Sequence, residues 1–140
     1  MSPPTLRVQI VTPDGTALEE SGADVIVLHR REGRFDPGSE IAVFPLHGPL
    51  LVRVPISPVR YRKEGESVHL AVAGGFAEVL RDGVLIVTPR VERVSRADPH
   101  PLATAVAICR KWRQEAFDSQ DMMVGYAQPD LAEAPPILPP

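Results

Sequence analysis

The chain has 140 residues, of which 44% are hydrophobic and 24% charged, and it carries a formal net charge of -3 with a pI near 5.8. This length and apolar content predict one packed domain with room for a small appendage. The mild acidity argues against nucleic-acid binding through clustered cations. The single cysteine, Cys109, excludes an intrachain disulfide and a cysteine-based zinc site.

The sequence shows no targeting or membrane-spanning segment. Its first residues, MSPPTLRVQ, lack the basic and apolar regions of a secretion signal, and no stretch reaches the roughly 20 apolar residues that span a bilayer. We therefore expect a cytoplasmic chain that reaches a membrane only through a partner.

From Leu6 to about Thr88, apolar residues occur in short runs rich in valine, isoleucine and leucine, separated by turn signals. Regular spacing of this kind predicts an all-β sandwich or barrel. The turn signals are Asp14-Gly15, Ser21-Gly22, Pro37-Gly38, Glu64-Gly65 and Asp82-Gly83.

Some of these runs predict particular strands. Leu6 to Ile10 alternates apolar and polar residues, which predicts a strand with one buried face. Asp24 to Leu28 is apolar nearly throughout, which favours a central strand covered on both sides. Phe76 to Leu80 and Val84 to Val87 predict a hairpin, because the Asp-Gly pair between them readily takes the positive φ values of a two-residue turn.

Four prolines lie close together between these runs, at Pro45, Pro49, Pro55 and Pro58. Proline has no N–H to give to a ladder, so it is found at the edges and ends of strands. The stretch is therefore predicted to contain only short strands or edge positions and to form a rim of the sandwich.

A helix is predicted to follow Ser95. Asp98 can serve as its N-cap, Pro99 suits its first position and Pro101 falls in its first turn. Apolar residues then recur at steps of three and four and predict one stripe that packs permanently on the sandwich. The stripe consists of Leu102, Ala105, Val106, Cys109, Trp112, Ala116 and Phe117.

The end of the helix has two readings. It runs on to about Ala127, or Asp118-Ser119 ends it and caps a short second helix; in both cases Pro129 is predicted to end it. The prolines beyond favour an extended, mobile tail. We therefore divide the chain into a β-sandwich domain (1–94), a helical segment (95–128) and a Pro-rich tail (129–140).

Two adjacent glycines, Gly74 and Gly75, interrupt the strand pattern LAVAGGFAEV of Leu70 to Val79. A phosphate-binding loop would need a helix and a lysine after them, and neither follows. A hairpin turn would suit Gly-Gly. A sharp bend that carries one long strand from one sheet to the other also suits it, and explains why apolar residues continue on both sides. We favour this sheet-crossing bend.

The glycine segment AVAGGFAEV resembles Ala-Val-Ser-Gly-Gly-Phe-Leu-Glu-Val of the epsilon subunit of bacterial F-type ATP synthases. Three further segments agree in the same order, so the resemblance extends from about Leu6 to Asp98. They are Val11 to Gly15, Glu40 to Leu50 and Glu92-Arg93.

The resemblance implies a mostly β fold: a two-sheet antiparallel sandwich of about ten strands, followed by a small helical segment. It also implies a non-catalytic subunit of the central stalk that binds the gamma subunit, rests on the c ring and turns with the rotor. Such a subunit couples ion translocation to ATP synthesis at the cytoplasmic face of the membrane. In many members of the family the helices can also restrain ATP hydrolysis.

In this family, loops near the positions of Thr12, Glu40 and His47 face the c ring, so the resemblance makes these residues contact candidates. The alternative is local: Thr12 shapes a turn, and His47 satisfies a nearby backbone group.

The sequence also departs from the family. The segment from Arg30 to Ser39 is longer than usual, and Leu46 replaces a glycine. Asp98 matches the first residue of an ATP-binding Asp-x-x-Arg-Ala motif, but Pro101 and Leu102 stand where arginine and alanine belong, so no ATP site of this kind is expected. The short helical segment predicts weak or no self-inhibition.

Two other functions compete with this one. An enzyme is disfavoured because the sequence contains no nucleophile elbow or metalloprotease motif, and Cys109 on the apolar stripe should have a high pKa. A free-standing β-sandwich module that binds a ligand or peptide is disfavoured by the 5% aromatic content. No cofactor, metal or small-molecule substrate is expected.

Overall fold

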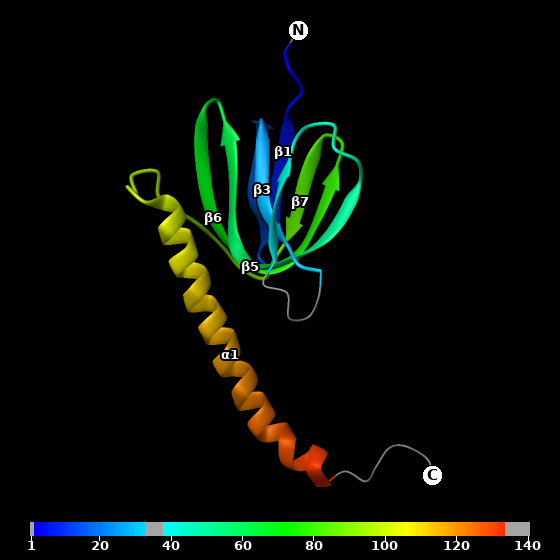
Figure 1. Cartoon of the computed structure of the whole chain (residues 1–140), viewed down its shortest axis with the longest axis vertical. Helices are drawn as coiled ribbons and strands as arrows, with labels where there is room; N and C mark the ends of the chain where they lie inside the picture. The colour runs from blue at the N-terminus through cyan, green and yellow to red at the C-terminus, as the bar shows by residue number, and fades with distance from the viewer. Residues whose placement is uncertain (1, 33–37, 134–140) are drawn as a thin grey trace.

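A computed structural model describes residues 2–32 and 38–133, and beyond residue 119 its backbone alone. Within these residues, eight strands form one continuous sheet in the order β2-β1-β7-β6-β5-β3-β4, with β8 paired to β6, and one helix follows (Figure 1). The strands are β1 (Leu6–Thr12), β2 (Gly15–Ala23), β3 (Val25–Arg30), β4 (Ser39–Val43), β5 (Leu50–Lys63), β6 (Glu66–Leu80), β7 (Gly83–Val87) and β8 (Val91–Arg93).

The sheet folds over into two layers because β5 and β6 are long enough to belong to both. Residues 70–72 of β6 pair with β8, whereas residues 76–80 pair with β7. Layer 1 contains β2, β1, β7, the second half of β6 and the first half of β5. Layer 2 contains β8, the first half of β6, the second half of β5, β3 and β4. The predicted mostly β sandwich is confirmed, with eight strands in place of about ten.

Gly74 and Gly75 lie where β6 passes from one layer to the other, with φ values of 83° and 117°. In the paired strand, Val54 faces Gly75 and Ile56 faces Ala73, which leaves Pro55 between them without a partner. An added Cβ on Gly75 would lie 2.0 Å from the Val87 carbonyl oxygen. The bend is therefore tight enough to exclude any side chain at Gly75.

The predicted rim of short strands around the clustered prolines is wrong. β5 has 14 residues and lies between β6 and β3. Pro55 falls at the bend, and Pro58 falls outside the ladder with β3, which covers only residues 60–62 of β5. Both prolines therefore sit where the long strand can lack an N–H donor.

The core lies between the two layers. Leu6, Val8 and Ile10 are fully buried, as the alternation in β1 predicted. The hairpin of β6 and β7 is also confirmed, from Phe76 opposite Val87 to Leu80 opposite Gly83.

β3 differs from its prediction. It is central by pairing, between β5 and β4, but it is fully buried on one face only. Ile26 and Leu28 are fully buried, whereas Val25 and Val27 are half-buried. Half-covered valines are compatible with a strand because β-branched side chains pack well on a pleated surface.

The helix, α1 (Pro101–Glu133), is a single element of 33 residues. It continues through Pro129, past the predicted end at residue 128, and no second helix is present in the described part of the chain. A proline inside a helix removes one backbone hydrogen bond, and here the break falls only four residues before the end. The predicted mobile tail from residue 134 on lies outside the described residues.

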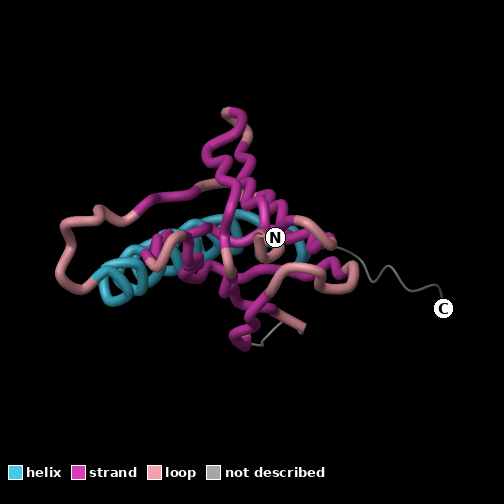
Figure 2. The backbone as a smooth tube through the Cα atoms, turned by 90° about the horizontal axis from the view of Figure 1, so that it is seen from above, coloured by secondary structure: helices cyan, strands magenta, loops and turns pink. Residues whose placement is uncertain are grey.

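The first half of α1 packs on the outer face of layer 2, as Figures 1 and 2 show. Its buried seam is narrower than the predicted stripe: Ala105, Cys109 and Trp112 are buried, whereas Leu102 and Phe117 are 45% and 63% exposed. The seam contacts a cluster on β5 and β6 that consists of Ile56, Ala71 and Ala73. Small alanine side chains on β6 let the helix approach the sheet closely.

Polar contacts fasten this seam near the bend. The Arg113 guanidinium donates to the Ile56 carbonyl oxygen at 2.9 Å. The Arg90 guanidinium lies 4.4 Å from the centroid of the Trp112 ring and 3.4 Å from a carboxylate oxygen of Glu115. These contacts connect α1 to β5 through Arg113, and to the segment just before β8 through Trp112 and Glu115.

Candidate interaction site

The structure does not bring the three contact candidates together. Thr12 is the last residue of β1. Because Val11 pairs with Val87, the last residue of β7, the two strands end at the same end of the sandwich. His47 lies in the loop before β5, whose neighbouring Leu46 N–H donates to the carbonyl oxygen of Arg81, just before β7 begins. The five residues of β7 separate the two positions by about 16 Å at roughly 3.3 Å per residue.

Glu40 lies in layer 2 but toward the same end as Thr12. It pairs with His29, close to the bridge between Arg31 and Arg53. Arg53 of β5 pairs with Phe76 of β6, which pairs with Val87 of β7, and Val87 pairs with Val11 of β1. Arg53 and Val11 therefore lie in one row across the strands. Thr12 and Glu40 thus share the end at the bend, and His47 lies at the opposite end.

Two of the candidates make local hydrogen bonds. The Thr12 hydroxyl accepts from the Asp14 N–H at 3.2 Å and lies 3.3 Å from the Gly15 carbonyl oxygen, to which it donates. The His47 Nδ1 donates to the Gly48 carbonyl oxygen at 2.8 Å. Each side chain therefore supports its own turn, whatever else it contacts.

Leu46, which stands where the resembling sequences have glycine, has a φ of 68°, in the left-handed region that favours glycine. Its side chain is 57% exposed. The turn is therefore formed with backbone strain at a residue that has a Cβ.

Glu40 is the one candidate with a charged partner. Arg60 donates to its two carboxylate oxygens at 2.9 and 3.3 Å. This hydrogen bonding lowers the pKa of Glu40 below its ordinary value of 4.5. The side chains are 49% and 34% exposed, so solvent screens the pair.

The Glu40–Arg60 pair gives a measurable pH dependence of stability. Because the folded-state pKa of Glu40 is lowered, the stabilisation is present above pH 4.5 and is lost as the pH falls through the folded pKa. Glu40→Gln is therefore expected to cost about 0.5 kcal/mol at pH 7 and less at pH 3. Urea unfolding at the two pH values measures this, and an equal cost at both would contradict it.

Asp98 caps the turn that leads into α1. Its carboxylate accepts from the His100 N–H at 2.8 Å and from the Thr104 hydroxyl. These two hydrogen bonds, chiefly the one from Thr104, lower the pKa of Asp98. The first backbone hydrogen bond of the helix runs from the Thr104 N–H to the His100 carbonyl oxygen. An N-cap at Asp98 would start the helix at residue 99, whereas α1 starts two residues later, at Pro101.

Other features of the described residues bear on the competing functions. Burial raises the pKa of the Cys109 thiol, as its place on the apolar stripe predicted. Among the side chains that the structure describes, in residues 2–32 and 38–119, no group of three or more potential metal ligands comes together. Within the described backbone, α1 is too polar to qualify as a membrane span.

Sequence reasoning missed an apolar surface on the outside of layer 1. Leu51 of β5, Phe76 of β6 and Val87 of β7 are 70%, 52% and 49% exposed. The signal was present in Phe76 to Leu80, where Glu78 is the one charged residue and both faces of the strand are otherwise apolar.

Comparison with known proteins assigns a family to the sandwich. Residues 5–94 match the family described as the ATP synthase delta/epsilon chain β-sandwich domain. The ATP synthase epsilon chain of Shouchella clausii is 35% identical over 67% of this chain and 65% of its own length, so the match spans just under two thirds of that relative. The ATP synthase epsilon chain of Bacillus subtilis is 34% identical over 83% of this chain and 80% of its own.

Solved structures share the fold. A chain of the Euglena gracilis mitochondrial ATP synthase OSCP/F1/c-ring structure superposes with a TM-score of 0.57 at 22% identity, over 79% of this chain and 67% of the other. A chain of the Tetrahymena thermophila ATP synthase central stalk/c-ring structure gives 0.52 at 17% identity, over 86% and 98%.

Proposed function

The chain belongs to the family of ATP synthase delta and epsilon chains, and on this premise we propose that it is a non-catalytic subunit of the central stalk. In this role it binds the gamma subunit and the c ring and couples ion translocation to ATP synthesis. It is held at the cytoplasmic face of the membrane through the complex and does not insert into the bilayer.

The observation that carries the proposal is the family match over the whole sandwich, residues 5–94. A two-layer sandwich with a continuous core suits a part that passes on rotation, because close-packed interiors deform little under load. Relatives that carry the epsilon-chain name and structural neighbours from ATP synthases support the same role.

For the contact with the c ring we propose Thr12 and Glu40, which share the end of the sandwich at the bend. His47 lies at the opposite end of β7, so it can touch the same partner only if that partner covers the full length of layer 1. We therefore assign His47 to a second contact, with gamma.

The proposal is tested by co-expression with the gamma, alpha and beta subunits of an ATP synthase from the same organism. A tag on gamma is expected to recover the chain in stoichiometric amount. A free-standing β-sandwich module, the competing function, would be absent from the purified complex and would elute alone.

We also propose that self-inhibition by α1 is weak. The seam at Ala105, Cys109 and Trp112 holds the helix on layer 2, and the described chain has no second helix to form a longer arm. Deletion of residues 95–140 is therefore expected to leave ATP hydrolysis by the assembled complex nearly unchanged. A several-fold rise in the hydrolysis rate would show that the helix restrains the enzyme.

A further inference from the structure

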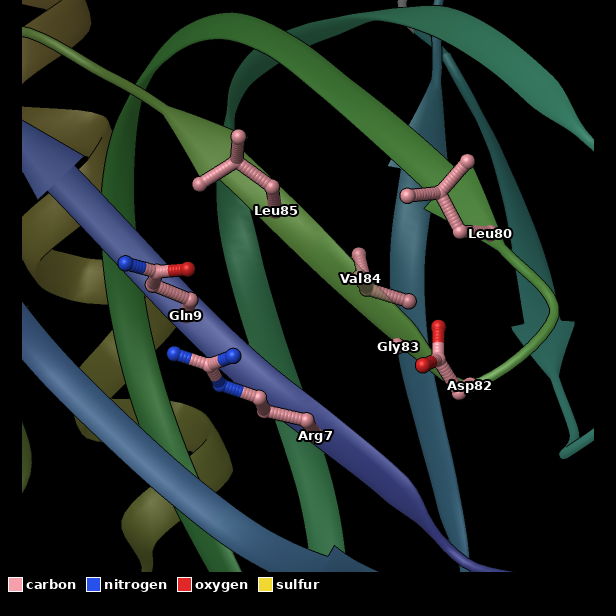
Figure 3. A pocket seen from close by; sticks show the side chains of 7 residues that line it. All are labelled: Arg7, Gln9, Leu80, Asp82, Gly83, Val84 and Leu85. Atoms are coloured by element: carbon pink, nitrogen blue, oxygen red, sulfur yellow. The ribbon is translucent and has the colours of Figure 1, made fainter.

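His69 of β6 carries a ring nitrogen that is buried without a hydrogen-bond partner. The side chain is half-buried, its Nδ1 is fully buried, and no described residue bonds to that nitrogen. Side chains such as Arg7 and Asp82 differ, because they are exposed around an open hollow between β1 and the β6–β7 hairpin (Figure 3). Buried polar atoms are usually hydrogen-bonded, so the Nδ1 of His69 needs an explanation.

His69 faces the side of layer 2 that α1 covers. Side chains two residues apart in a strand share a face, so His69 lies on the face of β6 that carries Ala71 and Ala73. The Val94 N–H donates to the His69 carbonyl oxygen at 2.9 Å, which extends the pairing of β6 with β8 by one residue. Val94 is on this outer face too, yet it is only 6% exposed. This end of the face is therefore covered as well.

The first turns of α1 account for this cover. The helix runs toward the bend, where Trp112 packs in the cluster that includes Ala73. The path back from Trp112 to Ala105 is about 10 Å at 1.5 Å per residue, and the path back from Ala73 to His69 is about 13 Å at 3.3 Å per residue. Ala105, which is fully buried, therefore comes to the level of His69.

Arg60 is the charged residue opposite His69. It pairs with His69 across β5 and β6, and its guanidinium lies 2.9 Å from a carboxylate oxygen of Glu40. Burial, and then the charge of Arg60, lower the pKa of His69 below its ordinary value of 6.5. His69 is therefore neutral at pH 7.

The other charges around this face do not offset Arg60. The carboxylates on the adjoining segments are Glu92, which is exposed on β8, and Asp98, which accepts from the His100 N–H and the Thr104 hydroxyl. α1 has no acidic residue before Glu115. The cations and titratable groups on the surrounding elements are Arg62, Arg96, His29, His100, Arg110 and Lys111.

Protonation of His69 would add a buried N–H that has no acceptor. The imidazolium ion carries an N–H on both ring nitrogens, whereas the neutral ring can leave Nδ1 without a hydrogen. A buried N–H without an acceptor and a second cation beside Arg60 both cost free energy. Water relieves this cost only when α1 moves away from the sheet.

We propose that His69 makes the contact between α1 and layer 2 sensitive to pH: the helix docks over the neutral imidazole and loosens when His69 takes up a proton. The docked chain binds fewer protons than the released chain. Docking is therefore strongest above pH 6.5 and weakens as the pH falls from 6.5 through the lowered pKa of the docked state. This property belongs to the chain by itself and does not depend on the proposed function.

The rate at which dithiodipyridine modifies Cys109 in the full-length chain tests this contact, because Cys109 is fully buried between α1 and layer 2. Division by the rate for the chain unfolded in urea at the same pH removes the titration of the thiol itself. The ratio is expected to rise at least about threefold between pH 7.5 and pH 5.5. In His69→Gln and His69→Leu, whose new side chains do not titrate, the ratio should be the same at both pH values.

The matched controls are His29→Gln, on the same outer face, and His100→Gln, just before α1; both should keep the rise. The emission of Trp112, the single tryptophan, should shift to longer wavelength over the same pH range and gives a second readout. A ratio that does not change with pH in the unaltered chain would overturn the proposal. An equal rise in the two His69 variants would also overturn it, because the proton would then bind elsewhere.

Discussion

Replacement of Gly75 by alanine is expected to prevent stable folding. The new Cβ would lie 2.0 Å from the Val87 carbonyl oxygen and 3.1 Å from its carbon, in backbone that cannot move without separating β6 from β7. The φ of 117° adds strain for any residue with a Cβ. We expect a loss of at least about 4 kcal/mol, a large part of the stability of a small domain. Soluble yield and urea unfolding measure it.

Two other glycines calibrate this experiment. At Gly74 an added Cβ would lie 3.2 Å from the Val54 carbonyl oxygen, so Gly74→Ala should cost less, about 1–3 kcal/mol, chiefly from its φ of 83°. At Gly48 no heavy atom lies within 4 Å and φ is not positive, so Gly48→Ala should change stability by no more than about 0.5 kcal/mol. Similar urea midpoints for Gly75→Ala and Gly48→Ala would show that the bend does not require a residue without a Cβ.

Replacement of Trp112 by alanine is expected to release α1 from layer 2 while the sandwich stays folded. Trp112 is 4% exposed, packs in the cluster with Ala71 and Cys109, and lies under the Arg90 guanidinium. Truncation of a buried aromatic side chain typically costs about 3–5 kcal/mol. The seam buries few other large side chains, so this loss should exceed what holds the helix in place.

The release of α1 is measured by the rate at which a thiol reagent modifies Cys109, a residue of α1 that is fully buried between the helix and layer 2. Trp112→Ala should accelerate the modification by at least about a hundredfold, the factor that corresponds to roughly 2.7 kcal/mol. Phe117→Ala, at an exposed position of the same helix, should leave the rate unchanged. A thiol that stays protected in Trp112→Ala would mean that the polar contacts of Arg113 and Glu115 suffice.

Local patterns predicted the parts of the fold that depend on near neighbours. The alternation in β1, the hairpin of β6 and β7, and the onset of a helix after Ser95 all follow from residues within one strand or turn. The prediction of short strands around the clustered prolines was wrong because the cost of a missing N–H depends on the partner strand. Pro55 falls at the bend and Pro58 outside the ladder between β5 and β3, and only the strand register reveals this.

The candidate site was less predictable, because its residues are related by strand direction and not by sequence distance. Thr12 and His47 both stand next to turns, yet β7 places them at opposite ends of the sandwich. The apolar surface on the outside of layer 1 depends on which strands neighbour each other: Leu51, Phe76 and Val87 resemble ordinary strand residues until β5, β6 and β7 are placed side by side.

Strand β6 has a consequence for how sequences of this kind can change in length. Its 15 residues place small side chains beneath α1, two residues without a Cβ at the bend and large apolar side chains on the outside of layer 1. Insertion or deletion of one residue would reverse the facing of everything on one side of it. Evolutionary gaps should therefore fall in the turns at Glu64-Gly65 and Arg81-Asp82, and Glu66–Leu80 should keep a constant length even where its residues diverge.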